Sequence, residues 1–281
     1  MLYPLFSCLR LPKLSYTREY SFELSGVEVR FSVPPMSSKW GSQRQFQDVF
    51  NLYNEDDYVR KDDPTPYIRC YITDWDVKGI PFFQEAKGTV PLYVSVSHWK
   101  GGGNLLRPRD MEAALTDINE TEYADDQKCD KSVMTLLNWT PVIINGQEWL
   151  SYKTEEEAGS TTHQFLWVMP VSDQHFLMFS FPTRAYNLRP EVLEAMKNFC
   201  TQIMQSVHIT FPDWVLRLKA EAQEKWPDEQ YSQTKEPLRW LREDPPPMRF
   251  DEASYNARHG ITEDSTEVET DDSDVEEKSK M

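Results

Sequence analysis

Short polar turns that separate pairs of strand-like segments constrain the fold of this chain more than any other feature. The clearest is Asn145-Gly146, because both positions of a two-residue hairpin turn need a positive φ angle, which asparagine and glycine adopt readily. Ser25-Gly26 and Ser172-Asp173-Gln174 separate two further pairs. The flanking segments are residues 20–24 and 27–33, 141–144 and 147–152, and 164–171 and 175–181. The pattern predicts an antiparallel sheet built from hairpins.

Two or three helices are expected to pack on this sheet, which makes the predicted fold class α+β. Apolar residues at helical spacing begin near Pro108 and again at Pro190. Asp213 is expected to cap a third helix that runs over about residues 213–226. The apolar stripe of the second helix, which predicts its buried side, consists of Val192, Leu193, Met196, Phe199, Cys200 and Ile203.

Composition divides the chain into three parts. Residues 1–14 form a short apolar segment, and residues 15–242 form the α+β domain. Within that domain, residues 40–90 mix aromatic and acidic residues and are expected to be irregular, like an insertion, with a short strand at 67–72. Residues 243–281 carry 13 acidic and four basic side chains. Too few apolar groups are available there to offset the entropy of ordering, so this acidic tail is predicted to be disordered.

The charge and the missing motifs exclude several functions. The net charge is −16, whereas nucleic-acid binding needs a basic surface, so no nucleic-acid partner is expected. No apolar run reaches the length of a membrane span, and the N-terminus is a poor signal peptide, which predicts a cytoplasmic location. The four cysteines are scattered and are interpreted as reduced thiols. No cofactor and no metal site are expected.

A glycine-rich loop after the strand predicted at 90–97 is the most suggestive candidate site. Its backbone N–H groups would approach a phosphate, with basic side chains nearby. The candidate residues are His98, Lys100, Gly101, Gly102, Gly103 and Arg107. The spacing matches neither a P-loop nor a dinucleotide-binding motif. A flexible loop or lid is therefore the favoured interpretation.

Histidines and aromatic residues supply two weaker candidates. His163 and His175 flank the last hairpin with Asp173 at its turn, an arrangement that would need a third ligand to hold a metal, so ordinary hairpin residues are favoured. A cluster of acidic residues in the aromatic stretch, including Asp74 and Asp76, is interpreted as a solvated loop. The aromatic residues of the same stretch would give a partner protein large contact area and are Trp40, Tyr53, Tyr58 and Trp75.

Two blocks of the sequence together resemble the PsbP/DcrB-like α+β domains. Phe22–Val33, followed by Pro34 and Trp40, resembles their opening hairpin. Asn145–Trp149, the paired strands of 164–181 and the helix Leu193–Ser206 resemble their ending. The resemblance covers about residues 16–211 and implies an antiparallel sheet packed by an N-terminal and a C-terminal helix. The chain is also similar to a group of uncharacterised bacterial proteins of comparable length.

The resemblance implies no catalytic residues, because this fold family shares none. Its members include lipoproteins, photosystem subunits, and chaperones or immunity-type proteins of bacterial secretion systems. Together with the acidic surface, this predicts a non-enzymatic protein-binding module in the bacterial cytoplasm, with a basic protein as its partner. The alternative from another class is a hydrolase or transferase that uses the glycine-rich loop at residues 98–107.

Overall fold

The computed structural model describes residues 10–39, 41–79, 86–124, 131–157, 161–186 and 190–240. The chain divides into one unit that spans Met1–Arg242 and a second that spans Glu243–Met281. The predicted acidic tail lies outside the described residues, as do Cys8, Cys129 and Trp40. Two sheets and three α-helices make up the described part, so the predicted α+β class is confirmed.

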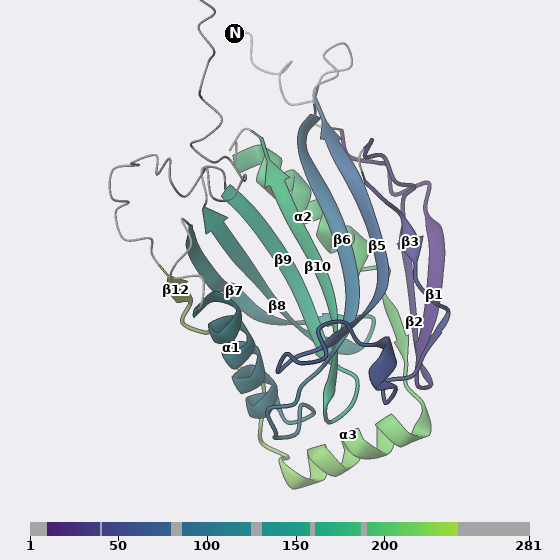
Figure 1. Cartoon of the computed structure of the whole chain (residues 1–281), viewed down its shortest axis with the longest axis vertical. Helices are drawn as coiled ribbons and strands as arrows, with labels where there is room; N and C mark the ends of the chain where they lie inside the picture. The colour runs from purple at the N-terminus through teal and green to yellow at the C-terminus, as the bar shows by residue number, and fades with distance from the viewer. Residues whose placement is uncertain are drawn as a thin grey trace, which may run out of the picture. The chain divides into compact units, whose positions relative to one another are not determined.

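The larger sheet has eight strands, and every neighbouring pair is antiparallel. In spatial order the strands are β12 (Leu238–Trp240), β7 (Ser132–Ile144), β8 (Gln147–Glu157), β9 (Thr161–Pro170), β10 (His175–Ala185), β6 (Ala86–His98), β5 (Tyr67–Lys78) and β3 (Arg44–Gln45). Two predicted hairpins, β7–β8 and β9–β10, are consecutive in this sheet (Figure 1).

The smaller sheet has four strands in the order β11 (His208–Thr210), β2 (Val27–Val33), β1 (Arg18–Leu24) and β4 (Val49–Phe50). Its centre is the predicted β1–β2 hairpin. Ser25 and Gly26 in its turn have φ angles of 48° and 94°, and Asn145 and Gly146 in the β7–β8 turn have 47° and 79°. The positive φ angles expected at Asn145 and Gly146 are therefore confirmed, and the Ser25-Gly26 turn shares them.

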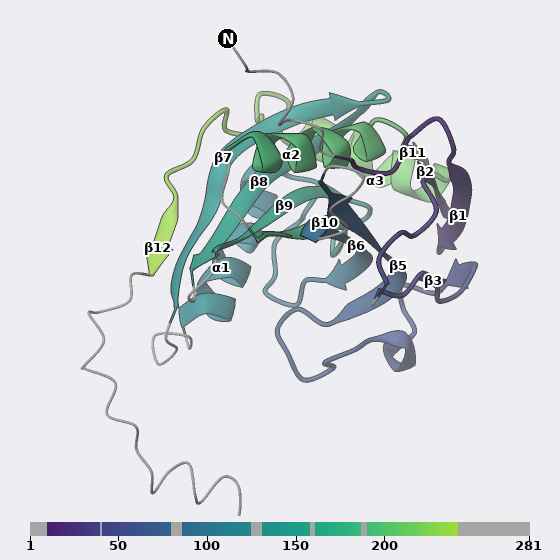
Figure 2. The ribbon, with the colours of Figure 1, turned by 90° about the horizontal axis from the view of Figure 1, so that it is seen from above.

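Helices α1 (Pro108–Ala124) and α2 (Pro190–Met204) lie on opposite faces of the large sheet (Figure 2). The predicted stripe of α2 faces the main core, with Phe199 and Cys200 both buried. That core also contains the inward side chains of the small sheet, so it joins the two sheets through α2. A second core lies beneath α1 and includes Leu115 and Leu166.

The N-cap residue of the third helix, α3 (Asp213–Lys225), lies one position before the predicted one. Pro212 occupies the N-cap position with φ −72° and makes no side-chain cap hydrogen bond. Asp213 is the first helical residue, where its carboxylate still interacts favourably with the helix dipole. The prediction that Asp213 caps the helix was wrong, because proline with its fixed φ already ends the preceding extended segment.

The stretch at residues 40–90 is more ordered than the sequence suggested. The strand predicted at 67–72 extends to Lys78 as β5 and pairs with β6 inside the large sheet. Asp74 and Asp76 therefore lie on a strand and not in a solvated loop. They alternate with buried Trp75 and Val77, which is the period of two expected for a half-buried strand.

Candidate functional site

The outer face of the small sheet carries a group of acidic side chains. Alternation along β1 and β2 places Phe22, Leu24, Val27 and Val29 in the core. The intervening side chains therefore point outward. Four carboxylates gather on this side, from Glu19, Glu23, Glu28 and Asp48, and we call this set the acidic face.

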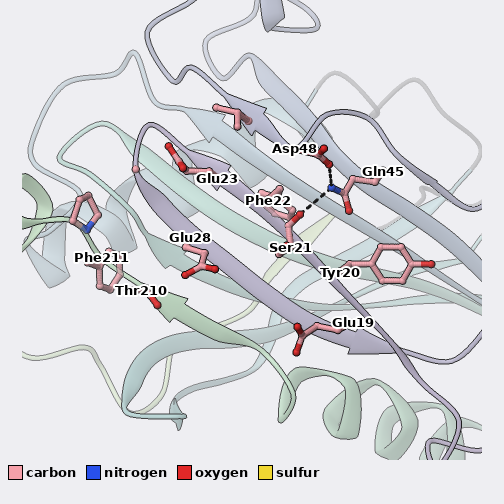
Figure 3. Close-up of a pocket in the computed structure, with 13 residues that line it drawn as sticks. Glu19, Tyr20, Ser21, Phe22, Glu23, Glu28, Gln45, Asp48, Thr210 and Phe211 are labelled. Carbon is pink, nitrogen blue, oxygen red and sulfur yellow. Dashed lines mark hydrogen bonds between the residues drawn. The ribbon is translucent and has the colours of Figure 1, made fainter.

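The acidic face surrounds an open hollow of about 750 Å³. Figure 3 shows the four carboxylates around it, three on the hairpin and Asp48 on the segment before β4. Thr210 and Phe211 border its other side, and Val49 is 61% exposed there. No lysine or arginine lines the hollow among the described residues.

Glu23 and Glu28 are direct cross-strand partners in the β1–β2 register. Two like charges in this position destabilise a sheet by a few tenths of a kcal/mol to about 1 kcal/mol. Glu28 has one cation nearby, the guanidinium of Arg30 at 3.4 Å, and both side chains are 46% exposed. An exposed pair of this kind contributes little. The repulsion between the two glutamates is thus only partly offset within the described residues.

Hydrogen bonds fix the segment that carries Asp48 against β1. The amide Nε2 of Gln45 donates to the Asp48 Oδ1 at 2.6 Å and to the backbone carbonyl of Ser21 at 2.9 Å (Figure 3). The N–H of Glu23 donates to the Asp48 carbonyl at 2.8 Å. These hydrogen bonds hold Asp48 beside the hairpin glutamates. Its exposed carboxylate is therefore already in place before a partner binds.

The glycine-rich loop is tied into the fold through many of its own polar groups. Trp99 Nε1 donates to the Gly102 carbonyl at 2.7 Å, and Lys100 Nζ donates to the Lys61 carbonyl at 2.7 Å. The backbone N–H of Asn104 donates to the Asp110 carboxylate at 2.9 Å. Gly102 and Gly103 have φ angles of 84° and 82°, so the glycines serve a tight turn.

Arg107, the second cation of the predicted phosphate loop, is engaged elsewhere. Its guanidinium donates to both carboxylate oxygens of Glu229, at 2.9 and 2.7 Å, and to Asp110 at 3.3 Å. The Glu229 hydrogen bond raises the pKa of Arg107 further above its usual range. The structure therefore separates Arg107 from Lys100 in function, and the enzymatic alternative stays a prediction without a further observation in its favour.

The structure brings His98 together with His175, and not His163 with His175. His163 lies opposite Thr183 in the β9–β10 register, whereas His175 lies at the other end of the hairpin, opposite His98 of β6. A metal site between His163 and His175 is thereby excluded by the hairpin register. No group of three His, Cys, Asp or Glu side chains suited to a metal ion occurs in the described residues.

The four aromatic residues predicted as a partner surface divide into different environments. Trp75 is fully buried and donates its Nε1–H to the Pro34 carbonyl at 3.1 Å. Tyr58 is also buried and donates to the Leu52 carbonyl at 2.7 Å. Tyr53 is 62% exposed, and Trp40 lies outside the described residues. Trp75 on β5 and Tyr58 in the loop before it both pack in the main core, so they present no contact area to a partner.

Comparisons with known proteins add one structural similarity. No protein-family model and no curated protein matches the sequence. Among solved structures, the chain is similar to the solution structure of cyanobacterial PsbP (CyanoP) from Synechocystis sp. PCC 6803, with a TM-score of 0.40 and 14% sequence identity over 70% of this chain and 95% of that chain. A similarity of this size does not establish a shared function. No helix among the described residues combines the length and the apolar character that a membrane span requires.

Proposed function

We propose that this chain is a non-enzymatic protein-binding module that receives a basic segment of a partner protein on its acidic face. The observation that carries the proposal is the Glu23–Glu28 cross-strand pair, which places two like charges opposite one another on an exposed sheet. A lysine or arginine from a partner would turn that repulsion into attraction. The two remaining carboxylates, Glu19 and Asp48, border the same hollow and would extend the contact.

The geometry favours an extended or loop segment over a folded helix. The hollow is open and shallow, and it lies across short strands instead of between helices. Phe211 and exposed Val49 provide apolar contacts at its rim for the aliphatic stems of basic side chains. The net charge of −16 adds a long-range attraction for basic partners, which speeds association and weakens with salt.

The proposal also includes a cellular role and a location. A chaperone or immunity-type role in a bacterial secretion system, in the cytoplasm, is supported by the sequence resemblance described above. Both roles consist of holding another protein, and a preformed charged surface is suited to that task. Neither requires a catalytic group.

The binding test compares two pairs of substitutions that remove the same charge. Fluorescence anisotropy would measure the affinity of a labelled oligolysine peptide for the full chain, for Glu23→Gln/Glu28→Gln and for the control Glu191→Gln/Glu194→Gln. The control glutamates are exposed on α2. We expect the first pair to weaken binding roughly three- to tenfold relative to the control pair, since exposed charge contacts contribute up to about 1 kcal/mol each. If the two double variants lose the same amount of affinity for the peptide, the acidic face is not the binding site.

The stability test separates a binding role from a structural one. Glu23→Gln removes the repulsion but keeps the Glu28–Arg30 pair. If the glutamates serve binding at a cost in stability, the free energy of unfolding should rise by roughly 0.2–1 kcal/mol. Urea unfolding measures this change. A loss of stability would mean that Glu23 supports the fold, and the proposal would lose its central observation.

A further inference from the structure

A second cavity lies on the opposite side of the main core, where α1 covers only part of the large sheet. Its volume is about 820 Å³, within the range of small-molecule sites. Residues of β5, β6, β8, β9 and β10 line it on the sheet side, and Leu115, Ile118 and Tyr123 of α1 line it from the helix side. Figure 1 shows α1 in front of one side of the large sheet. We call this cavity the sheet groove. It shares no lining residue with the acidic face.

Two serines on the floor have hydroxyl groups that lack a hydrogen-bond partner among the described residues. Val94 and Val96 of β6 point into the main core, so Ser95 and Ser97 face the groove, where both line the cavity. Their exposed fractions are 5% and 4%. Neither hydroxyl makes a hydrogen bond to another described residue. Nearby Ser180 differs, because its hydroxyl accepts a hydrogen bond from Gln164 Nε2 at 2.7 Å.

The guanidinium of Arg69 lies beside these serines. Arg69 is the cross-strand partner of Ser95, and Tyr67 is the partner of Ser97. Arg69 donates one hydrogen bond to the Tyr67 hydroxyl at 3.0 Å and has no carboxylate partner among the described residues. A guanidinium has five N–H donors in a planar fork that matches a carboxylate.

The groove has apolar and aromatic side chains next to the two serines, and elsewhere it is lined by polar ones, among them Glu122 of α1, Thr154 of β8 and Gln164 of β9. Phe176 and Met178 of β10 lie next to the serines across the sheet, since the register pairs Ser97 with Phe176 and Ser95 with Met178. The aromatic ring of Tyr93 is 46% exposed on the same floor. The groove therefore offers one guanidinium and two hydroxyls directly beside an apolar surface, which together can recognise a polar head group with an apolar body.

We propose that the sheet groove binds a small amphipathic carboxylic acid, with its carboxylate on Arg69, Ser95 and Ser97 and its apolar body between α1 and β10. A single negative charge fits better than a phosphate dianion. The other arginine that lines the groove, Arg60, has Asp63 at 3.8 Å, so within the part of the chain that the structure describes Arg69 is the lining cation with no acidic partner. The hydroxyls supply two further donors, and charge-assisted hydrogen bonds of this kind are strong.

Isothermal titration with octanoate and 1-octanol on the full chain tests the proposal. The two probes share the same carbon chain length and differ in the head group. We expect octanoate to bind in preference to 1-octanol. Arg69→Gln should reduce octanoate affinity about tenfold or more and leave 1-octanol affinity unchanged, because the lost contact is to the carboxylate. Ser95→Ala/Ser97→Ala should reduce octanoate affinity by a smaller factor.

The matched control is Arg184→Gln. Arg184 is an exposed arginine on the face of β10 that also carries Phe176 and Met178, but it does not line the groove. Its substitution should leave octanoate affinity unchanged, and thermal unfolding should show that both arginine variants fold. Equal affinity for octanoate and 1-octanol, equal losses in the two arginine variants, or no binding of octanoate would overturn the proposal. Binding of a peptide with a free C-terminal carboxylate in place of octanoate would also overturn the small-molecule assignment.

Discussion

His98 and His175 stack face to face across strands β6 and β10. Their ring centroids are 4.7 Å apart, and the ring planes differ by 22°. Tyr53 and Tyr58 enclose His175 from the loop that precedes β5, with ring centroids at 5.5 and 6.5 Å. Burial, followed by the neighbouring His98, lowers the pKa of His175 to about 4. Burial also lowers the pKa of His98.

This pair predicts a specific loss of stability in mild acid. His175 is neutral in both states above its unfolded pKa of about 6.5. Below that value the unfolded chain binds a proton that the folded chain rejects until pH 4, so the free energy of unfolding falls as the pH drops from about 6.5 to 4. The full effect is roughly 3 kcal/mol. Urea unfolding at several pH values measures it.

His175→Gln is the comparison that isolates the effect. The variant lacks the buried imidazole, so its stability should depend less steeply on pH across the same window. Buried His163 also has a lowered pKa and remains in both proteins, so its contribution cancels in the difference. Parallel pH profiles for the two proteins would show that His175 does not contribute.

The edge-on contact between Phe199 and Trp75 predicts a large mutational cost in the main core. The two ring centroids are 5.1 Å apart with planes at 81°, and Phe199 is 4% exposed. Phe199→Ala should lower the free energy of unfolding by about 3–5 kcal/mol, since it removes a buried ring and leaves a cavity. Lys197→Ala, on the exposed side of the same helix, should change it by no more than about 0.5 kcal/mol. Similar effects of the two substitutions in chemical denaturation would contradict the packing of α2.

Helix α2 packs closely against the large sheet at Gly88, which leaves no room there for a side chain. A Cβ atom at this position would lie 2.4 Å from the Arg184 carbonyl oxygen and 2.4 Å from Met196 Cε of α2. Gly88→Ala should therefore destabilise the protein by about 1–3 kcal/mol, the usual cost of overpacking. Gly79→Ala is the control, because its Cβ would meet only the flexible side chain of Lys87, at 3.1 Å. If Gly88→Ala leaves the thermal unfolding temperature unchanged, α2 can shift away from the sheet at little cost, which would contradict the close packing.

The hairpins and the α2 stripe could be predicted from the sequence because their signals are local. A two-residue turn at Ser25-Gly26 determines both the turn geometry and the register. That register already places Glu23 opposite Glu28, so this pair of the acidic face can be predicted from the hairpin sequence alone. Ser95 and Ser97 likewise alternate with apolar residues in a strand that was predicted correctly.

The remaining features depend on contacts between distant segments. His98 meets His175 only because β6 pairs with β10, and no local pattern indicates that strand order. The aromatic character of Trp75 suggests a contact surface, whereas the pairing of β5 with β6 places this side chain in the core and leaves Asp74 and Asp76 on the other face of the strand. The sheet groove exists because α1 covers only part of the sheet face, which is a consequence of helix packing and not of any short motif.

Amide chemical shifts of the isotope-labelled full chain during titration with an oligolysine peptide would locate the basic partner directly. If the acidic face is the binding site, the largest shift changes should occur at Glu19, Ser21, Glu23, Glu28 and Thr210, and added salt should reverse them. The acidic tail at residues 243–281 carries 13 further acidic side chains and supplies the internal comparison. Changes confined to that tail, with the β1–β2 hairpin unaffected, would contradict the acidic face as the binding site.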